Sequence, residues 1–300
     1  MSVVVVGSIN ADLHLRVARH PSPGETLLAS GGTISPGGKG ANQACAAALT
    51  GARTVLLGAV GSDGAREAAL RLLKSAGVDL THLVHLDEAP TGLAVVTVDE
   101  AGENTVLVVP GANRLVSRDM VERGTPVIRA DGVVVVQGEI PPAVSAAAVR
   151  EATRRVVVNL APAIDVEPAL LLRADPLVVN EHEGKDALRQ LSAHSGGSPG
   201  AVVEALLGAG VPSVVLTLGA QGALVGQGTQ VVRVAAPRVV AVDTVGAGDA
   251  FAGALAARLD AGETLLEAAR YATRFAAYTV QHEGAQASYP AAGTMLPELP

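Results

Sequence analysis

Short runs of valine and other aliphatic residues recur along this chain, with longer helix-forming segments between them. The apolar runs occupy residues 2–6, 54–60, 132–136, 155–159, 176–180 and 213–218. Continuous apolar runs of this length are typical of strands that are covered on both faces. Segments 66–77, 142–155 and 200–210 have helical spacing instead. This alternation predicts an α/β protein with a three-layer αβα, Rossmann-like core and a mostly parallel sheet.

Two stretches interrupt the alternation. Residues 13–35 and 91–109 are predicted to form strands without an intervening helix, and the second is a hairpin that turns at DEAGEN, 99–104. We expect the two stretches to pair as a small β-sheet lid that stands off the core. The core then comprises residues 1–12, 36–90 and 110–300. The alternative is that these segments are edge strands of the main sheet.

Composition limits the partners of this protein. Of its 300 residues 49% are hydrophobic and 17% charged, which is typical of a packed globular protein. A net charge of −7, with three Tyr, two Phe and no Trp, argues against nucleic-acid binding but allows a small pocket for one anion. Cys45 is the sole cysteine, which excludes an intrachain disulfide and a thiolate metal cluster. Without a basic leader or an apolar run of membrane length, we expect no membrane association and a cytoplasmic location.

Polar or glycine-rich segments follow several of the predicted strands. Ligands bind beyond the carboxyl ends of parallel strands, so these segments are candidate site residues. They are Asn10 and Asp12, Glu139, NEHE at 180–183 and TLGAQG at 217–222. For Asn10 and Asp12 alone, a role as turn residues is the alternative.

The tract PGGKGANQACAAA, residues 36–48, resembles a phosphate-binding P-loop only superficially. Thr33 stands where that loop needs its first glycine, and Gly40 stands where it needs Ser or Thr. The glycines instead let backbone amides approach a polyol at a helix start, with Lys39 and Asn42 as hydrogen-bonding side chains.

The stretch DTVGAGDAF, residues 243–251, places three small residues and an acid at the start of a helix. The bare amides of Gly246, Ala247 and Gly248 at a helix N-terminus form a cradle for an anion. Asp249 beside it is placed to accept a proton from an alcohol. The pattern therefore indicates phosphoryl transfer to a hydroxyl group. A helix-capping aspartate with flexible glycines is the alternative.

These stretches, with GSINADL, TGLAVVTVDEAGENTVLVVPGAN, NLAPA and EGAQASYP, resemble the ribokinase-like (PfkB) carbohydrate kinases over essentially the whole chain. The resemblance implies ATP-dependent phosphorylation of D-ribose at the 5-hydroxyl, giving D-ribose 5-phosphate and ADP. It also implies Mg²⁺ bound with ATP, K⁺ as a monovalent activator and a homodimer formed through the lid.

The resemblance further implies roles for individual positions. Asp249 is the implied base, and Gly246, Ala247 and Gly248 are the implied anion hole. The implied sugar-binding residues are Asn10, Ala11, Asp12, Gly38, Lys39, Gly40, Ala41, Asn42, Glu139 and Asp249. The implied nucleotide-binding residues are Asn180, Thr217, Leu218, Gly219, Ala220, Gln221, Gly222, Gly248, Asp249 and Thr273. Glu183 is implied to hold Mg²⁺ through water. The implied K⁺ residues are Asp243, Val245, Thr279, His282, Gly284 and Ser288.

The sequence departs from the family pattern at positions that concern the adenine and K⁺ contacts. Ala252 stands where relatives often have Asn, and His282 where Arg is common; Thr273 also stands where related enzymes carry other side chains. For Asp243, a role in capping its loop is the alternative to cation binding. None of these departures changes the residues implied in phosphoryl transfer.

Two other functions are compatible with parts of the pattern. A kinase of the same fold for another small sugar or a nucleoside, such as deoxyribose or adenosine, would keep the chemistry. The aliphatic, non-aromatic lid segments favour a polyol over a nucleoside. A catalytically silent sugar sensor is the second, and it would not need to keep Asp249, the small-residue cradle and NEHE.

Overall fold

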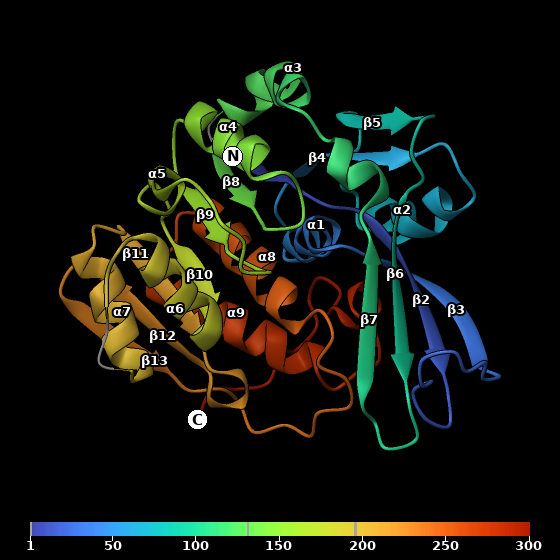
Figure 1. The fold of residues 1–300 in the computed structure, drawn as a ribbon. Helices are drawn as coiled ribbons and strands as arrows, with labels where there is room; N and C mark the ends of the chain where they lie inside the picture. The colour runs from blue at the N-terminus through green and yellow to red at the C-terminus, as the bar shows by residue number, and fades with distance from the viewer. Residues whose placement is uncertain (1, 131, 195–196) are drawn as a thin grey trace.

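A nine-stranded sheet forms the centre of the protein (Figure 1). The computed structural model describes residues 2–130, 132–194 and 197–300. The spatial order of the strands is β13-β12-β11-β10-β9-β8-β1-β4-β5. The parallel strands are β1 (Ser2–Val6), β4 (Thr54–Gly61), β5 (Leu83–Leu86), β8 (Gly132–Val136), β9 (Val156–Asn159), β10 (Leu177–Asn180) and β11 (Ser213–Thr217). Strands β12 (Ala223–Gln227) and β13 (Gln230–Val234) are added antiparallel, so the predicted mostly parallel sheet is confirmed.

Helices cover both faces of this sheet. One face carries α1 (Lys39–Leu49), α2 (Ala65–Ser75), α8 (Ala247–Asp260) and α9 (Leu265–Thr279). The other carries α3 (Arg118–Ile128), α4 (Pro142–Glu151), α5 (Pro168–Leu171), α6 (Glu181–Gln190) and α7 (Pro199–Gly208). Short 3₁₀ turns lie at Gly111–Leu115 (η1), Gly219–Gln221 (η2) and Gln286–Ser288 (η3).

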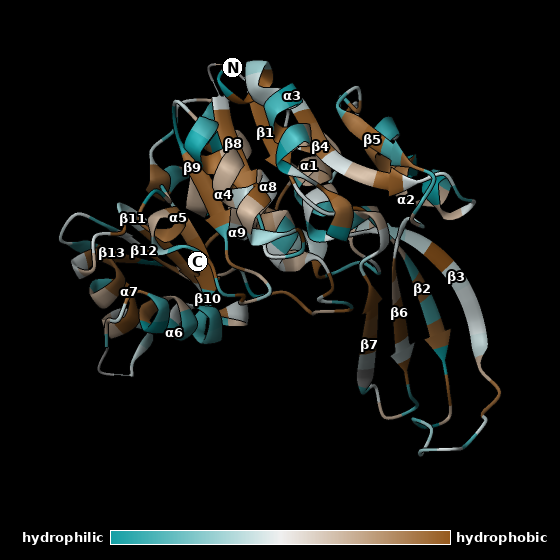
Figure 2. Cartoon of the chain, turned by 45° about the horizontal axis from the view of Figure 1, so that its top comes forward, coloured by the Kyte–Doolittle hydropathy of each residue, from teal (hydrophilic) through white to brown (hydrophobic). Residues whose placement is uncertain are grey.

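The valine runs are explained by this three-layer arrangement. In β1, Val3 and Val5 pack against the layer that contains α1 and α8, whereas Val4 and Val6 pack against the opposite layer. All four are buried, because successive side chains of a strand point to opposite faces. Figure 2 shows the same pattern as apolar colouring along β1, β8 and β9. Because both faces of such a strand are covered, polar residues do not alternate with apolar ones along it.

A second, four-stranded sheet projects from the body (Figures 1 and 2). It consists of β3 (Ser30–Gly37), β2 (Asn10–Arg16), β6 (Gly92–Val98) and β7 (Asn104–Val109), in that spatial order. The predicted small sheet is thus confirmed, and the alternative of edge strands on the main sheet is wrong. The exact division into core and lid segments stays a prediction; β2 itself begins at Asn10, which places Asn10 and Asp12 on a lid strand.

The described helices include none that combines the length and the apolar character needed to span a bilayer.

Candidate active site

The acid of the DTVGAGDAF stretch lies in the first turn of α8. The chain enters this helix through Gly246, which has a left-handed φ of 75°. Glycine is required there, because a Cβ at this position would lie 2.6 Å from Cβ of Ala285. Asp249 is 5% exposed, and its carboxylate accepts hydrogen bonds from Nδ2 of Asn42 (2.9 Å) and Nε2 of Gln43 (3.1 Å). The chain entry and two amides from α1 therefore fix the position of this carboxylate.

Backbone amides are available at the same helix entrance. In the described part of the chain, the N–H groups of Gly246, Gly248 and Asp249 have no acceptor. The N–H of Ala247 donates to the carbonyl of Thr244 in a long bond of 3.3 Å. A helix N-terminus with free amides binds negative charge, so this entrance can hold a phosphoryl group. The structure assigns most of that capacity to Gly246, Gly248 and Asp249 rather than to Ala247.

Ser8, which follows β1, holds the N-terminus of α1 through two hydrogen bonds. Oγ of Ser8 accepts from the amide of Gly40 at 3.2 Å, and the Ser8 carbonyl accepts from the amide of Ala41 at 2.8 Å. Gly38, with a φ of 87°, allows the close approach, since a Cβ there would lie 2.7 Å from the amide nitrogen of Asn10. The amides of Gly40 and Ala41 thus have protein partners, and these two bonds position the start of α1.

Polar side chains from three elements gather beside this helix start. Oε2 of Glu139 accepts from Oγ of Ser8 at 2.6 Å and from the amide of Lys39 at 3.0 Å. Oδ1 of Asn10 accepts from Nδ2 of Asn113 at 2.8 Å, which orients the Asn10 amide. The carboxylate of Asp249 raises the pKa of Lys39, and those of Glu139 and Glu183 add to this against the effect of burial. Lys39 therefore stays positively charged among carboxylates from the loop after β8, from α6 and from α8.

Asp12 is the carboxylate of this group that has no bonded partner. Its Oδ1 is buried and has no hydrogen-bond partner among the described residues. Gly37 on the neighbouring strand leaves it room, because a Cβ at Gly37 would lie 2.0 Å from Oδ2 of Asp12. Burial is the main cause that raises the pKa of Asp12 from 3.8 to about 7, and the negative charges of Glu139 and Asp249 contribute to the same shift. An unsatisfied buried carboxylate of this kind is suited to accept hydrogen bonds from the hydroxyls of a ligand. Ala11, next to it, is buried in the core and can contribute only its backbone.

The raised pKa of Asp12 leads to a prediction about stability. The folded protein binds more protons at this site than the unfolded chain between about pH 4 and pH 7, so the Asp12 contribution to stability falls as pH rises through that window. We expect Asp12→Asn to raise the unfolding temperature of the free protein at about pH 8 and to change it much less near pH 4.

Thermal unfolding of both proteins at several pH values measures this difference. Asp87→Asn, at an exposed acid that follows β5, is the control for a general effect of removing an acid. A gain in unfolding temperature that does not grow with pH would contradict the assignment of the raised pKa to Asp12.

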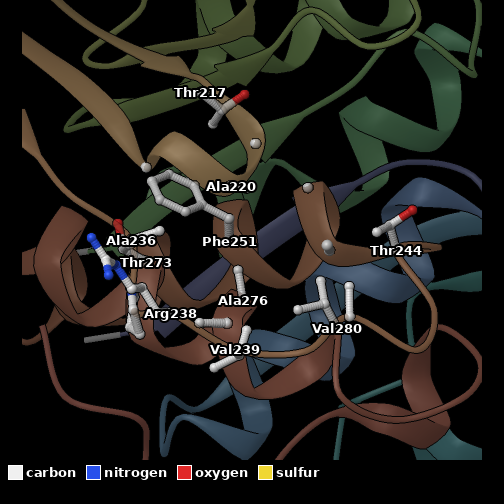
Figure 3. Close-up of a pocket in the computed structure, with 17 residues that line it drawn as sticks. Thr217, Ala220, Ala236, Arg238, Val239, Thr244, Phe251, Thr273, Ala276 and Val280 are labelled. Atoms are coloured by element: carbon white, nitrogen blue, oxygen red, sulfur yellow. The ribbon is translucent and has the colours of Figure 1, made fainter.

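A largely apolar cavity of about 520 Å³ opens on the other side of the α8 entrance (Figure 3). Of the residues predicted to bind a nucleotide, Thr217, Gly219, Ala220, Gly222, Gly248 and Thr273 line it. Leu218, Gln221, Asn180 and Asp249 do not. Thr273 presents little polarity, because its Oγ1 donates to the carbonyl of Ala269 at 2.8 Å. The volume and the apolar walls suit a flat heterocycle, with its phosphates toward Gly248.

Several cavity residues were not found from the sequence. They come from the segment after β13 and from α8 and α9: Ala236, Pro237, Arg238, Val239, Ala241, Thr244, Phe251, Ala276, Ala277 and Val280. In Figure 3 the Arg238 side chain lies beside Thr273 and Ala236. No local pattern marks these positions, because apolar residues on a helix or in a loop look the same whether they line a cavity or the core. Ser8, Gln43, Asn113, Asn159 and Gln286 were also missed, although the predicted motifs contain or adjoin them.

The NEHE segment forms the start of α6. The side chain of Asn180 accepts from the amides of His182 and Glu183, and Oε2 of Glu183 accepts from the amide of Asn180 at 2.8 Å. This reciprocal capping box explains both residue types without a ligand. Burial raises the pKa of Glu183, while its bond to the Asn180 amide and the charge of Lys39 oppose the shift. The charges of Lys39 and Asp249 therefore also affect the pKa of Glu183.

The residues implied to bind K⁺ meet around Asp243. Oδ1 of Asp243 accepts from the amide of Val245 at 2.9 Å, and Oδ2 accepts from the amide of Gly284 at 2.8 Å. This carboxylate joins the α8 entrance to the loop before η3. Thr279 and Ser288 are buried and donate their hydroxyls to the carbonyls of Phe275 and Ala285. His282 is different: its ring stacks on Tyr278 and its Nδ1 contacts the Tyr278 carbonyl, so only its backbone is available to a cation.

Comparisons with known proteins agree over the length of the chain. The sequence pattern described as pfkB family carbohydrate kinase matches residues 1–292. The chain is 36% identical to a ribokinase of Staphylococcus aureus, with 96% of each chain covered, and 32% identical to a deoxyribokinase of Salmonella typhi, with 97% and 96% covered. A solved structure of Arabidopsis thaliana ribokinase complexed with ribose and ATP superposes with a TM-score of 0.87 at 31% identity, over 97% of this chain and 96% of that one. This protein therefore belongs to the pfkB family of carbohydrate kinases.

Proposed function

We propose that this protein transfers the γ-phosphoryl group of ATP to the 5-hydroxyl of D-ribose, giving D-ribose 5-phosphate and ADP. One observation carries the proposal: the Asp249 carboxylate lies where a polar cradle around Asp12 and Lys39 meets an apolar, nucleotide-sized cavity. Gly248 lines that cavity and directly precedes the acid. The ribokinase relatives and the ribose and ATP complex of one of them support the two substrates.

Each part of the site has one task in the reaction. The sugar oxygen forms a bond to the γ-phosphorus, and the bond from that phosphorus to the β,γ-bridging oxygen breaks. The proton of the hydroxyl passes to the carboxylate of Asp249, and ADP leaves with the electron pair of the broken bond. The free amides at Gly248 and Asp249, with the positive charge of Lys39, stabilise the charge on the phosphoryl oxygens.

Sugar recognition in this proposal depends on the unpartnered acceptor of Asp12. Asp12 accepts hydrogen bonds from ring hydroxyls, and Asn10, Lys39 and Glu139 border the same space. A polyol suits this cradle because Asn10, Asp12, Lys39 and Glu139 all carry hydrogen-bonding side chains.

We propose that Mg²⁺ accompanies ATP, with Glu183 as its nearest protein acid. Among the described residues no cluster of three or more His, Cys, Asp or Glu side chains could hold a metal. This fits an ion held mainly by phosphate oxygens and water, which is the usual manner of Mg²⁺. The Glu183 oxygen that does not take part in the capping box is the available contact. The ion would neutralise charge on the phosphates.

The loop around Asp243 is the proposed K⁺ site. Its donor set is oxygen alone, from one carboxylate, two hydroxyls and backbone carbonyls, which suits a hard cation. Bound K⁺ would balance the charge of Asp243 beside the anion hole. We expect replacement of K⁺ by Na⁺ at fixed ionic strength to lower kcat by roughly tenfold, or about 1.4 kcal/mol of barrier. Steady-state assays of the parent and Asp243→Ala check this, and equal kcat in both salts would argue against the site.

We further propose that the lid pairs with the lid of a second copy. Val106, Leu107, Val108 and Val109 on the edge strand β7 are all about half exposed or more, and most of β7 has apolar colouring in Figure 2. An exposed apolar edge strand is normally covered by a partner. We expect Leu107→Glu to give a monomer of 30.0 kDa where the parent gives twice that mass by light scattering. Met295→Glu, at an even more exposed apolar residue far along the chain, should leave the mass unchanged.

An ADP-release assay with purified protein tests the function directly. D-ribose, deoxyribose, fructose and adenosine are compared at equal concentration, and the product from ribose is identified by NMR. D-ribose should have the highest kcat/KM. The specific alternative is deoxyribose, because a deoxyribokinase is 32% identical to this chain, and a higher kcat/KM for it would replace the proposed substrate.

A further inference from the structure

The Asp249 carboxylate is held by neutral groups. No ion pair joins it to a Lys, Arg or His within the described ranges, and its two oxygens each accept one amide hydrogen bond. Oδ2 is bonded by Asn42 and Oδ1 by Gln43, which are neighbours on α1. The direction of the carboxylate therefore depends on what holds these two amides.

Gln43 is the more firmly fixed of the two. It is fully buried, and its Nε2 donates to Oδ1 of Asn159 at 3.0 Å as well as to Oδ1 of Asp249 at 3.1 Å. Nδ2 of Asn159 in turn donates to the carbonyl of Val178 at 3.1 Å, on the neighbouring strand of the sheet. A chain of hydrogen bonds thus runs from the central sheet to the acid.

The carbonyl acceptor at one end of this series of hydrogen bonds determines which way each side-chain amide faces. The carbonyl of Val178 can only accept, so Asn159 must turn its NH₂ group toward it and its oxygen toward Gln43. Gln43 must then present its own NH₂ group, whose second proton faces Asp249. The orientation of both amides follows from the network, although oxygen and nitrogen look alike in such groups.

Close helix packing makes the contact possible. Gly253 lies one turn after Asp249 on α8, and a Cβ there would lie 2.3 Å from the carbonyl oxygen of Gln43. Only glycine allows α1 and α8 to approach this closely, so the Gln43 side chain reaches the acid across the helix interface. A second chain of hydrogen bonds reaches Oδ2 of Asp249. Nε2 of Gln286 donates to Oδ1 of Asn42 at 3.0 Å, and Nδ2 of Asn42 donates to Oδ2 of Asp249.

We infer that Gln43 is a positioning residue for the base: its amide, anchored through Asn159 to the sheet, aims the Asp249 carboxylate at the sugar hydroxyl. This deepens the proposed function and rests on it. Gln43 touches neither substrate; it acts by keeping one carboxylate oxygen occupied and the rotation of the group fixed. Loss of such orientation costs up to about 100-fold in rate in enzymes.

The test is a double-mutant cycle of Gln43→Met and Asp249→Asn. Methionine has similar length and helix preference but cannot donate a hydrogen bond. We expect Gln43→Met to lower kcat by about tenfold to 100-fold while KM for sugar and ATP changes by less than about threefold. In the Asp249→Asn background the same substitution should cause no further loss, because the carboxylate that Gln43 positions is already gone.

Gln190→Met is the matched control. Gln190 also uses both ends of its amide, with the amide of Val166 and the carbonyl of Ile164, but lies on α6 away from Asp249. Gln190→Met should keep the kcat of the parent even where it loses stability. Should Gln43→Met fail to fold, Gln43→Leu, which also has a good helix preference and no hydrogen-bond donor in its side chain, takes its place.

Three results would overturn the inference. They are an unchanged kcat, an equal loss in the two backgrounds, and misfolding of both Gln43 variants, which would make the residue purely structural. Failure of the proposed function is a separate result, because the parent would then release no ADP with ribose, or Asp249→Asn would stay active.

Discussion

Asp249→Asn is expected to lower kcat by about 100-fold to 10,000-fold, the range that general base catalysis contributes. The variant keeps the size of the side chain but cannot take the proton of the sugar hydroxyl. The surrounding Asn42 and Gln43 amides both donate to this position, so one of them would face an NH₂ group in the variant and a small loss of stability accompanies the change. KM for ribose should change little, because Asp12 and its neighbours remain in place.

The coupled assay for ADP release measures kcat, and isothermal titration calorimetry measures ribose affinity without a tryptophan signal. Asp260→Asn is the matched control: Asp260 is a buried acid at the opposite end of the same helix, and its loss should leave kcat unchanged. A kcat within about twofold of the parent in Asp249→Asn would remove the assignment of the base, since that is far below the contribution expected of one.

Gly246→Ala is expected to reduce both stability and activity. A left-handed φ of 75° costs a non-glycine residue about 1–2 kcal/mol, and the added methyl group would lie 2.6 Å from Cβ of Ala285 and 3.2 Å from Oη of Tyr289. Relief of these contacts must move the α8 entrance away from η3, and the free amides move with it. Loss of one oxyanion-hole donor typically costs about 100-fold to 1000-fold in kcat.

Alanine substitutions at two other glycines separate the effect of strain at Gly246 from the general effect of an added methyl group. At Gly248 a Cβ meets no atom within 4 Å, so Gly248→Ala should keep the fold; its methyl group would enter the nucleotide cavity and should raise KM for ATP. Gly208→Ala, on α7 and equally open, controls for the general effect of alanine in a helix. The explanation fails if Gly246→Ala has the unfolding temperature and kcat of the parent.

The fold could be read from the sequence because its signals are local. Valine at every position of residues 3–6 and 133–136 is typical of strands covered on both faces, and this fixes the three layers. The position of Asp249 in the first turn of a glycine-opened helix was likewise predicted, since GAGDA and the following apolar segment determine where α8 begins. The small second sheet followed from two segments that lack helices between their strands.

Only part of the lining of the proposed nucleotide cavity could be predicted from local sequence patterns. Residues 217–222 were predicted from their glycine-rich turn, but the opposite wall from Arg238 to Val280 is formed by apolar residues that α9 and the segment after β13 bring together. Asn180 and Glu183 form a capping box, and the family resemblance implies a nucleotide contact and a Mg²⁺ contact for the same residues. Sequence alone did not distinguish a helix cap from a ligand site here.

The sequence alone therefore determined the layers of the fold, the helix that carries the acid and the glycines at its entrance, because these depend on neighbours along the chain. Tertiary structure decided what surrounds the acid: Gln43 meets Asp249 across 206 positions, Asn42 meets Gln286 across 244, and Asp12 is left without a partner between two strands. Hydrogen bonds over such separations, and the burial that shifts the pKa of Asp12, arise only when helices and strands pack. No local pattern of residue types contains them.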